Sequence, residues 1–533
     1  MKKILFLTCL VAGISTSFAQ TDAEKYAAVI TGSNLKTHLS IIASADMQGR
    51  ETGTEGQRKA AFYIETQFKK IGLQSVPSLN GYQQFYPLYQ DSLKTGELTL
   101  AGKPAGYGKD FIINMNNNES GSFNGKKIIF AGYGIEDEKY NDYKGLNVKG
   151  KIVLLFLGEP KKDGKYFLGS SASRGSEWTF PGVSKKVALA AAKGAAGVLI
   201  ISPSQESFNE RAVAQGKKTG VYFPRANTAE AKTLNFAQLS HAFAKMIIGN
   251  NFDTLLKVAK ASGDIAGMPA ALGKGMESKT KVTYNFEKYR TTINASNVVG
   301  IIEGTDKKDE YVFLTGHYDH LGMRNGKIYY GADDDGSGTC AVINMAEAFA
   351  KAAAAGHRPR RTIVFMTVSG EEKGLWGSEY YSDHPFYPLE KTTVDLNTDM
   401  VGRIDTERKT DDTLNYVYVI GHDKISSDLP TINEGVNKKY TGLVLDYKFD
   451  DPKDENRIYF RSDHYNFARK GVPVLFFYDG MLKSDYHQPT DTVDKIYWDL
   501  YEKRVRMIFH TAWEMANRDE MLKRDTPLNM GTR

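Results

Sequence analysis

The sequence contains almost no cysteine. Its 533 residues include only Cys9 and Cys340, and Cys9 falls in an N-terminal segment that we expect to be removed. The mature chain then keeps a single cysteine and cannot form an intramolecular disulfide. Its stability must come from a hydrophobic core, and a chain of this length with 41% hydrophobic residues can build one.

A long apolar run is also missing. Lys2 and Lys3 precede an apolar stretch, residues 4–14, which is shorter than the ~20 residues that a transmembrane helix needs. Small residues ending at Ala19 complete the pattern of a secretory signal peptide over residues 1–19. We therefore expect an exported protein, periplasmic or extracellular, without membrane insertion.

Neither sign of charge is in large excess. The formal net charge is +6, and it falls to +4 without Lys2 and Lys3, because residues 1–19 contain no Asp or Glu. No stripe of basic residues with interleaved aromatic residues is present. These features argue against nucleic acid as a partner. They do not indicate the oligomeric state.

Hydrophobic periodicity predicts a helical start to the mature chain. A helical pattern runs from residue 21 to about residue 88 and is best over residues 55–71, where Ala61 and Phe68 share one face. Gly72 stands where a C-terminal helix cap belongs.

The pattern changes twice further along the chain. Between about residues 121 and 260, short β-rich runs bounded by glycine indicate a separate small α/β domain. From about residue 295, strand and helix patterns alternate, which predicts an α/β fold with a mixed, mostly parallel sheet covered by helices on both faces. We thus expect a discontinuous domain of residues 20–120 and 261–533, interrupted by residues 121–260. The expected strands are 311–315, 362–368, 393–396, 416–420 and 474–478, and the last helix is 494–518.

Polar residues follow these strand patterns, at the edge where an open α/β sheet binds ligands. The strand ends supply histidine, aspartate, glutamate, aspartate and histidine in turn. The segments are Gly316-His317-Tyr318-Asp319, Asp333-Asp334-Asp335, Gly370-Glu371-Glu372, Asn397-Thr398-Asp399 and Asp485-Tyr486-His487.

Each of these motifs alone is ordinary. A His-x-Asp pair is common on surfaces, a Glu-Glu pair often starts a helix, and residues 333–338 fit a helix N-terminus or part of a calcium loop. Their joint occurrence at the strand ends of one domain predicts a single site. Two imidazoles and several carboxylates suit two divalent ions, zinc first, with one bridging carboxylate and an open position for water.

In content and order, the motifs resemble those of the co-catalytic zinc aminopeptidases of the zinc exopeptidase superfamily. The resemblance extends upstream to Gly49-Arg50-Glu51-Thr52-Gly53. The segment 121–260, which includes Gly132-Tyr133-Gly134, is similar to a protease-associated (PA) domain. The resemblance implies a metallo-exopeptidase that acts on peptide substrates and holds two zinc ions per chain.

The resemblance also implies which residues bind metal. His317 and Asp399 would complete one metal site, and Glu372 and His487 the other. Asp334 would bridge the two ions.

Three further residues would act around the metals. Glu371 directly precedes a ligand and would be the general base toward the bridging water. By resemblance, the Tyr486 hydroxyl would donate to the developing oxyanion. Asp319 would orient His317 through its second ring nitrogen.

Two nearby features each fit two interpretations. Asp491, four residues beyond His487, fits either an orienting carboxylate for that imidazole or a helix cap. The run Arg461-Ser462-Asp463-His464 fits either substrate contacts or a capping Ser-Asp pair.

Three other functions fit parts of the pattern. A glutamate-carboxypeptidase-like enzyme shares both domains, but it needs a cluster of arginines for a substrate carboxylate, and Arg461 alone does not establish one. Glutaminyl cyclases generally lack the inserted domain. A transferrin-receptor-like binding protein lacks a working metal set. We therefore predict a zinc-dependent aminopeptidase, with the carboxypeptidase as the main alternative.

The predicted signal peptide can be tested directly. Cleavage after Ala19 should leave Gln20 as the first residue of the exported protein. N-terminal sequencing of protein from the medium or the periplasm checks this. Exported material that still begins at Met1 would contradict it.

Overall fold

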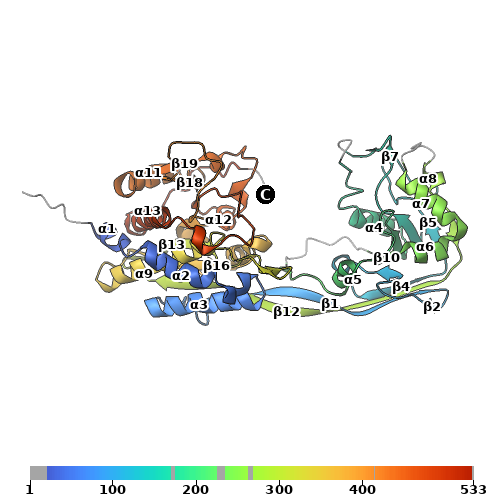
Figure 1. The fold of residues 1–533 in the computed structure, drawn as a ribbon, viewed down its shortest axis with the longest axis horizontal. Coiled ribbons are helices and arrows are strands. Elements are labelled where there is room, and N and C mark those ends of the chain that lie inside the picture. Colours follow the sequence, from blue (N-terminus) through green and yellow to red (C-terminus); the bar gives the residue numbers. More distant parts are fainter. Residues whose placement is uncertain (1–20, 170–173, 225–233, 262–267, 413, 531–533) are drawn as a thin grey trace, which may run out of the picture. The chain divides into compact units, whose positions relative to one another are not determined.

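The computed structural model describes residues 21–169, 174–224, 234–261, 268–412 and 414–530 (Figure 1). The predicted signal peptide lies outside these ranges. The chain forms two compact units, and the second is inserted into the first. Unit 1 comprises Met1–Tyr86 and Asn294–Arg533, and unit 2 comprises Pro87–Ile293.

Unit 1 is built on a mixed sheet. From one edge inward its strands are β19 (Val444–Asp446), β18 (Tyr416–Ile420), β20 (Val474–Tyr478), β17 (Thr392–Thr398), β13 (Lys307–His317), β16 (Arg361–Val368) and β12 (Val282–Ile302). The central strands β16, β13, β17 and β20 are parallel to one another. The strands β12 and β18 join them antiparallel.

Alternate residues of the central strands enter two different cores. In β13, Val312 and Leu314 belong to one hydrophobic cluster and Phe313 to another, as the twofold repeat of a strand requires. One face is covered by α1 (Asp22–Ala27), α2 (Gly32–Ile42), α3 (Glu55–Ile71), α9 (Gly336–Ala354), α11 (Leu429–Tyr440) and α13 (Trp498–Asn517). The other is covered by α10 (Trp376–Asp383) and α12 (His464–Ala468). The predicted α/β fold with helices on both faces is confirmed.

The N-terminal helical prediction is correct only in part. The helix α3 has the predicted bounds, and Gly72 ends it with a positive φ of 87°. The prediction of helix to about residue 88 is wrong, because β1 (Gln83–Leu100) begins at Gln83. Tyr86 and Leu88 are buried there on every second position, which is the repeat of a strand.

Unit 2 contains a six-stranded sheet in the order β11-β5-β6-β9-β10-β3, whose four middle strands are parallel. The predicted insertion, 121–260, lies inside this unit. The unit itself is wider because β1 and β12 are continuous strands that lead into it and out of it. Its sheet strands are β3 (Phe111–Ile112), β5 (Ile128–Phe130), β6 (Ile152–Phe156), β9 (Gly197–Ile201), β10 (Phe236–Leu239) and β11 (Glu277–Ser278).

The remaining elements of unit 2 are short. Its helices are α4 (Val183–Ala192), α5 (Glu210–Lys217), α6 (His241–Ile248), α7 (Phe252–Lys260) and α8 (Met268–Ala271). Its other strands are β2 (Lys103–Pro104), β4 (Gly121–Gly125), β7 (Lys161–Lys162) and β8 (Lys165–Tyr166). Among the residues that the structure describes in either unit, no helix has the length and apolarity of a membrane span.

One buried arginine joins several segments of unit 1. Arg50 is fully buried, and its Nε donates a hydrogen bond to the carbonyl of Tyr318, at 2.7 Å. Its Nη1 donates to the carbonyls of Ile42, at 2.8 Å, and Tyr330, at 2.7 Å. Its Nη2 donates to the carbonyl of Gly331, at 2.9 Å. The guanidinium thus ties the end of α2 to the end of β13 and to the loop before α9.

We predict that Arg50→Met destabilises unit 1 by about 3–5 kcal/mol, because it removes a charged donor from four carbonyls, of which that of Gly331 keeps a second donor, the N–H of Gly336 at 3.1 Å. Urea unfolding, followed by tryptophan fluorescence, measures the loss. Arg50→Lys should recover part of it, since an ammonium group still donates to some of these carbonyls.

Arg58→Met is the matched control. Arg58 lies on α3, and its exposed guanidinium pairs with Glu55, at 2.8 Å. Its loss should change the free energy of unfolding by less than about 1 kcal/mol. Equal effects for the two substitutions would contradict the role given to Arg50.

Candidate active site

The structure brings the five predicted ligands together at the carboxyl edge of the unit 1 sheet. They come from the end of β13, the loop before α9, the turn η4 (Glu371–Lys373) after β16, the end of β17 and the loop after β20. In that order they are His317, Asp334, Glu372, Asp399 and His487.

The donor atoms form two groups that share Asp334. His317 Nε2 lies 3.3 Å from Asp334 Oδ1 and 3.6 Å from Asp399 Oδ1. His487 Nε2 lies 3.2 Å from Asp334 Oδ2 and 3.1 Å from Glu372 Oε2. Ligands at tetrahedral zinc, with bonds of 2.0–2.2 Å, stand about 3.3–3.6 Å apart. Both groups are close to this spacing, and each uses a different oxygen of Asp334.

Several of these atoms are buried and face only one another. Among the described residues, His317 Nε2, Asp334 Oδ2 and Glu372 Oε1 form no hydrogen bond of good geometry, and the groups nearest to them are ionisable side chains of the same site. A buried polar atom without a partner is costly. A cation in each group would satisfy these atoms, and the mixture of imidazole nitrogen and carboxylate oxygen suits zinc. The residues present therefore fit two zinc ions.

The pKa values reflect the concentration of carboxylates. Burial lowers the pKa of His317, but the carboxylates of Asp399 and Glu371 raise it well above its usual value. Burial raises the pKa of Asp334, but His317 and His487 hold it well below its usual value. The pKa of His487 is raised to about 10, because the carboxylates of Asp334 and Glu372 favour its charged form more strongly than burial opposes it.

The loop that carries Asp334 is held by carboxylates on either side. Asp335 caps α9 by accepting from the main-chain N–H of Gly338, at 2.7 Å. It also accepts from the N–H groups of His317 and Met400, each at 3.0 Å. One side chain therefore fixes the ends of β13 and β17 against the start of α9.

Asp491 has neither of the roles considered for it in the sequence. Its carboxylate accepts from the main-chain N–H groups of Asp333 and Asp334, at 3.1 Å. It therefore anchors the loop that presents the shared carboxylate.

Asp319 lies beside His317 as predicted, but its carboxylate is not the nearest acceptor. The Nδ1 of His317 is 3.1 Å from the main-chain oxygen of Asp319 and 3.6 Å from its carboxylate. The carboxylate accepts from the Thr52 hydroxyl, at 2.6 Å, and from the N–H of Glu371, at 3.2 Å. Asp319 thus links the imidazole to the backbone of the predicted base.

Glu371 faces the site without belonging to either donor group. Its Oε2 lies 3.9 Å from His317 Nε2. Burial raises the pKa of Glu371 well above its usual value, and the carboxylates of Glu372 and Asp399 add to the shift. A carboxylate with a raised pKa is a better proton acceptor, which is what a general base requires.

His320 was given no role in the sequence analysis. It is fully buried, and its Nδ1 lies 2.8 Å from Glu372 Oε1 and 3.9 Å from Asp334 Oδ2. It therefore adds a third imidazole beside the second donor group. The available signal was its place at the end of the segment Gly-His-Tyr-Asp-His, one side chain beyond Asp319.

The segment 461–464 divides between the core and the cleft. Ser462 accepts a hydrogen bond from Asn397, and Asp463 accepts one from Ser378. Neither side chain caps α12. Only Arg461 reaches the cleft, where its Nη2 donates to the Tyr486 hydroxyl at 2.8 Å.

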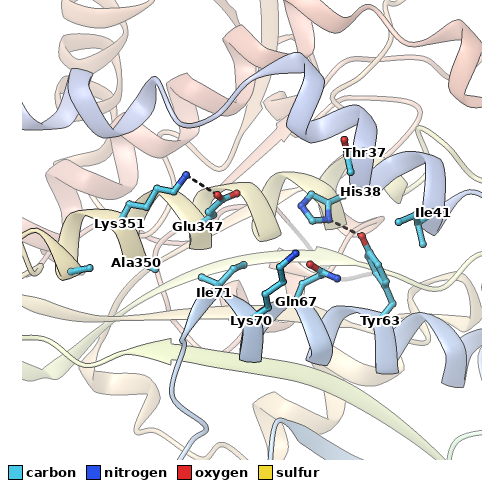
Figure 2. A pocket seen from close by; sticks show the side chains of 11 residues that line it. Thr37, His38, Ile41, Tyr63, Gln67, Lys70, Ile71, Glu347, Ala350 and Lys351 are labelled. Carbon is cyan, nitrogen blue, oxygen red and sulfur yellow. Dashed lines mark hydrogen bonds and ion pairs between the residues drawn. The ribbon is translucent and has the colours of Figure 1, made fainter.

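A pocket on the helical face of unit 1 contains none of these donors. It has a volume of about 490 Å³ and lies between α2, α3 and α9 (Figure 2). Four of its polar side chains interact in pairs. His38 Nδ1 lies 2.8 Å from the Tyr63 hydroxyl, and Lys351 lies 2.8 Å from Glu347.

A further cluster has the composition of a metal site but already contains a cation. His422, Asp423 and Asp450 bring three donor atoms close together. The ammonium group of Lys424 contacts both carboxylates, at 3.2 Å in the case of Asp450. The lysine thus supplies the positive charge that a metal would bring.

Comparison with known proteins finds two family models that match parts of this chain. Residues 297–512 match the model of Peptidase family M28, and residues 95–235 match that of the PA domain. The family relationship and the inserted PA domain predicted from the motifs are confirmed.

The chain is similar in sequence to proteins named as carboxypeptidases and to proteins named as aminopeptidases. A glutamate carboxypeptidase 2 homolog of Caenorhabditis briggsae is 24% identical over 516 residues, which cover 86% of this chain and 63% of the relative. Aminopeptidase YwaD of Bacillus subtilis is 24% identical over 325 residues, which cover 57% of this chain and 62% of the relative. The chain spans slightly less than two thirds of the length of these relatives. Among solved structures, an aminopeptidase from Aneurinibacillus sp. strain AM-1 is 18% identical, with a TM-score of 0.47 over 95% of this chain and 99% of that chain.

Substitutions of the adjacent residues Glu371 and Glu372 should affect metal content and kcat differently. We predict that Glu371→Gln keeps the metal content but lowers kcat by about 10²–10⁴-fold, because it removes the proton acceptor. Glu372→Gln should instead weaken metal binding, because it replaces a charged donor of the second group. Metal analysis after dialysis, together with kcat, separates the two effects. A Glu371→Gln enzyme with near-normal kcat would show that the base lies elsewhere.

Proposed function

We propose that the chain is an exported, zinc-dependent aminopeptidase that hydrolyses the N-terminal peptide bond of peptides. The observation that carries this proposal is the pair of donor groups sharing Asp334, with Glu371 beside them and bound to neither. Two zinc ions per chain would occupy these groups. When bound, such a pair of ions polarises the substrate carbonyl and lowers the pKa of a water molecule.

Three residues of the chain would have separate roles in the hydrolysis. Glu371 accepts a proton from the attacking water and passes it to the leaving amine, which its raised pKa favours. Asp319 holds the backbone of Glu371 through the N–H at 3.2 Å. The Tyr486 hydroxyl donates a hydrogen bond to the oxygen that becomes negative in the tetrahedral intermediate.

The charge of the cleft supports cleavage from the amino end. Glu371 lines the pocket beside the donor groups and belongs to neither, so its charge is not compensated by a metal ion, whereas those of Asp334 and Asp399 would be. Carboxylates attract the ammonium group of a peptide's first residue and repel the carboxylate of its last residue. The rest of the pocket wall is largely apolar and suits an apolar first side chain. The apolar lining residues are Met400, Ile458, Phe476 and Leu482.

The carboxypeptidase alternative rests on one observation, the similarity to the glutamate carboxypeptidase 2 homolog over most of this chain. Such an enzyme needs cations that bind a substrate carboxylate. Arg461 is the one cation among the residues that line this pocket, and it already donates to Tyr486. The aminopeptidase is therefore the better supported function. Export rests on the signal-peptide pattern of residues 1–19.

The direction of cleavage can be tested with three matched peptides. One has both ends free, one is acetylated at the amino end, and one is amidated at the carboxyl end. We expect acetylation to abolish hydrolysis, because the ammonium group is lost, and amidation to change kcat/KM by less than about threefold. Chromatographic separation of the products gives the rates. Cleavage of the acetylated peptide, with resistance of the amidated one, would identify a carboxypeptidase.

A further inference from the structure

We propose that Arg461 is a positioning residue, which holds the Tyr486 hydroxyl so that its proton points to the developing oxyanion. The proposal rests on the proposed peptidase function, because it deepens the role given to Tyr486. Arg461 and Tyr486 are 25 residues apart in the sequence and meet at the same pocket.

Contacts on two sides fix the tyrosine. Its ring stacks on the imidazole of His487, with the ring centres 3.9 Å apart and the planes at 20°. Its oxygen accepts a hydrogen bond from Arg461 Nη2 at 2.8 Å. The stacking sets the plane of the ring beside the second donor group. The hydrogen bond from the guanidinium fixes the position of the hydroxyl oxygen.

The direction of the hydroxyl proton follows from the chemistry of the pair. A guanidinium group has donors and no acceptor, so the Tyr486 oxygen can only accept from Arg461. The hydroxyl carries one proton, which this contact leaves free for another acceptor. An acceptor that is polarised by a cation also becomes a stronger donor. Arg461 therefore both directs the proton of Tyr486 and strengthens the hydrogen bond that it donates.

The backbone that presents Arg461 is itself held in the core. The next two residues, Ser462 and Asp463, are buried and accept hydrogen bonds from Asn397 and Ser378. Among the residues that the structure describes, Arg461 forms no ion pair that would hold its charge elsewhere. Arg403, in the same unit, shows the contrast, because its guanidinium pairs with Asp485 at 2.9 Å.

The test is a double-mutant cycle on the zinc-loaded enzyme. The variants are Arg461→Met, Tyr486→Phe and the double substitution, with Arg461→Lys as a conservative variant. Arg461→Met should lower kcat about tenfold and leave KM within about twofold, because the contact acts through Tyr486 on the transition state. The double variant should be no slower than Tyr486→Phe. Arg461→Lys should recover part of the rate, since an ammonium group can still donate.

Arg469→Met is the matched control. Arg469 is an exposed arginine next to α12 that donates to Ser382, at 3.2 Å, outside the pocket. Its kcat and KM should equal those of the wild type. Metal content is measured for every variant and should not change.

Two results would overturn the proposal. If Arg461→Met raised KM and left kcat unchanged, Arg461 would bind substrate directly. If the losses in kcat multiplied in the double variant, the two residues would act independently. The series is run with both the free and the acetylated peptide. An enzyme that cleaves only the acetylated peptide refutes the proposed direction, yet the cycle still measures the coupling between Arg461 and Tyr486.

Discussion

The hydrogen bonds of Arg50 are the contact on which the rest of the catalytic edge depends. Four carbonyls from three segments meet at this buried guanidinium, and one of them, that of Gly331, lies just before the loop that carries Asp334. The same loop continues into Asp335, whose carboxylate holds the N–H groups of His317 and Met400. Hydrogen bonds within the protein therefore define where the metal ligands stand.

This support explains how the fold tolerates so many carboxylates in one place. Like charges that are buried together destabilise a protein unless other groups compensate them. Here the structural carboxylates Asp335 and Asp491 accept hydrogen bonds from main-chain N–H groups. The carboxylates of Asp334 and Glu372 instead face the histidines of the site, and each keeps an oxygen without a hydrogen bond of good geometry. The two sets of carboxylates thus have different tasks, even where two of them, Asp334 and Asp335, are adjacent in sequence. One set builds the edge, and the other is left open toward cations.

The sequence predicted those elements whose signals are local. The strands β18 and β20 have the predicted bounds because they are continuous apolar runs, buried on both faces. Four of the five ligands could be found because they come after such strands, whereas Asp334 was found from the glycine- and aspartate-rich run just before α9. The strand β1 was missed where its alternation overlaps a helical pattern. The roles of Arg50, His320 and Arg461 could not be predicted, because their partners are distant in sequence and only the folded chain brings them together.

Unit 2 is inserted between two strands that are neighbours in the sheet. Unit 2 begins in β1 and ends in β12, and these are neighbouring strands of one sheet. The chain therefore leaves unit 1 and returns to it at neighbouring positions of the sheet. A short hairpin between β1 and β12 could connect these positions at little cost in loop entropy. The strands that carry the ligands all lie outside the inserted unit, so the register of these strands does not depend on what connects β1 to β12.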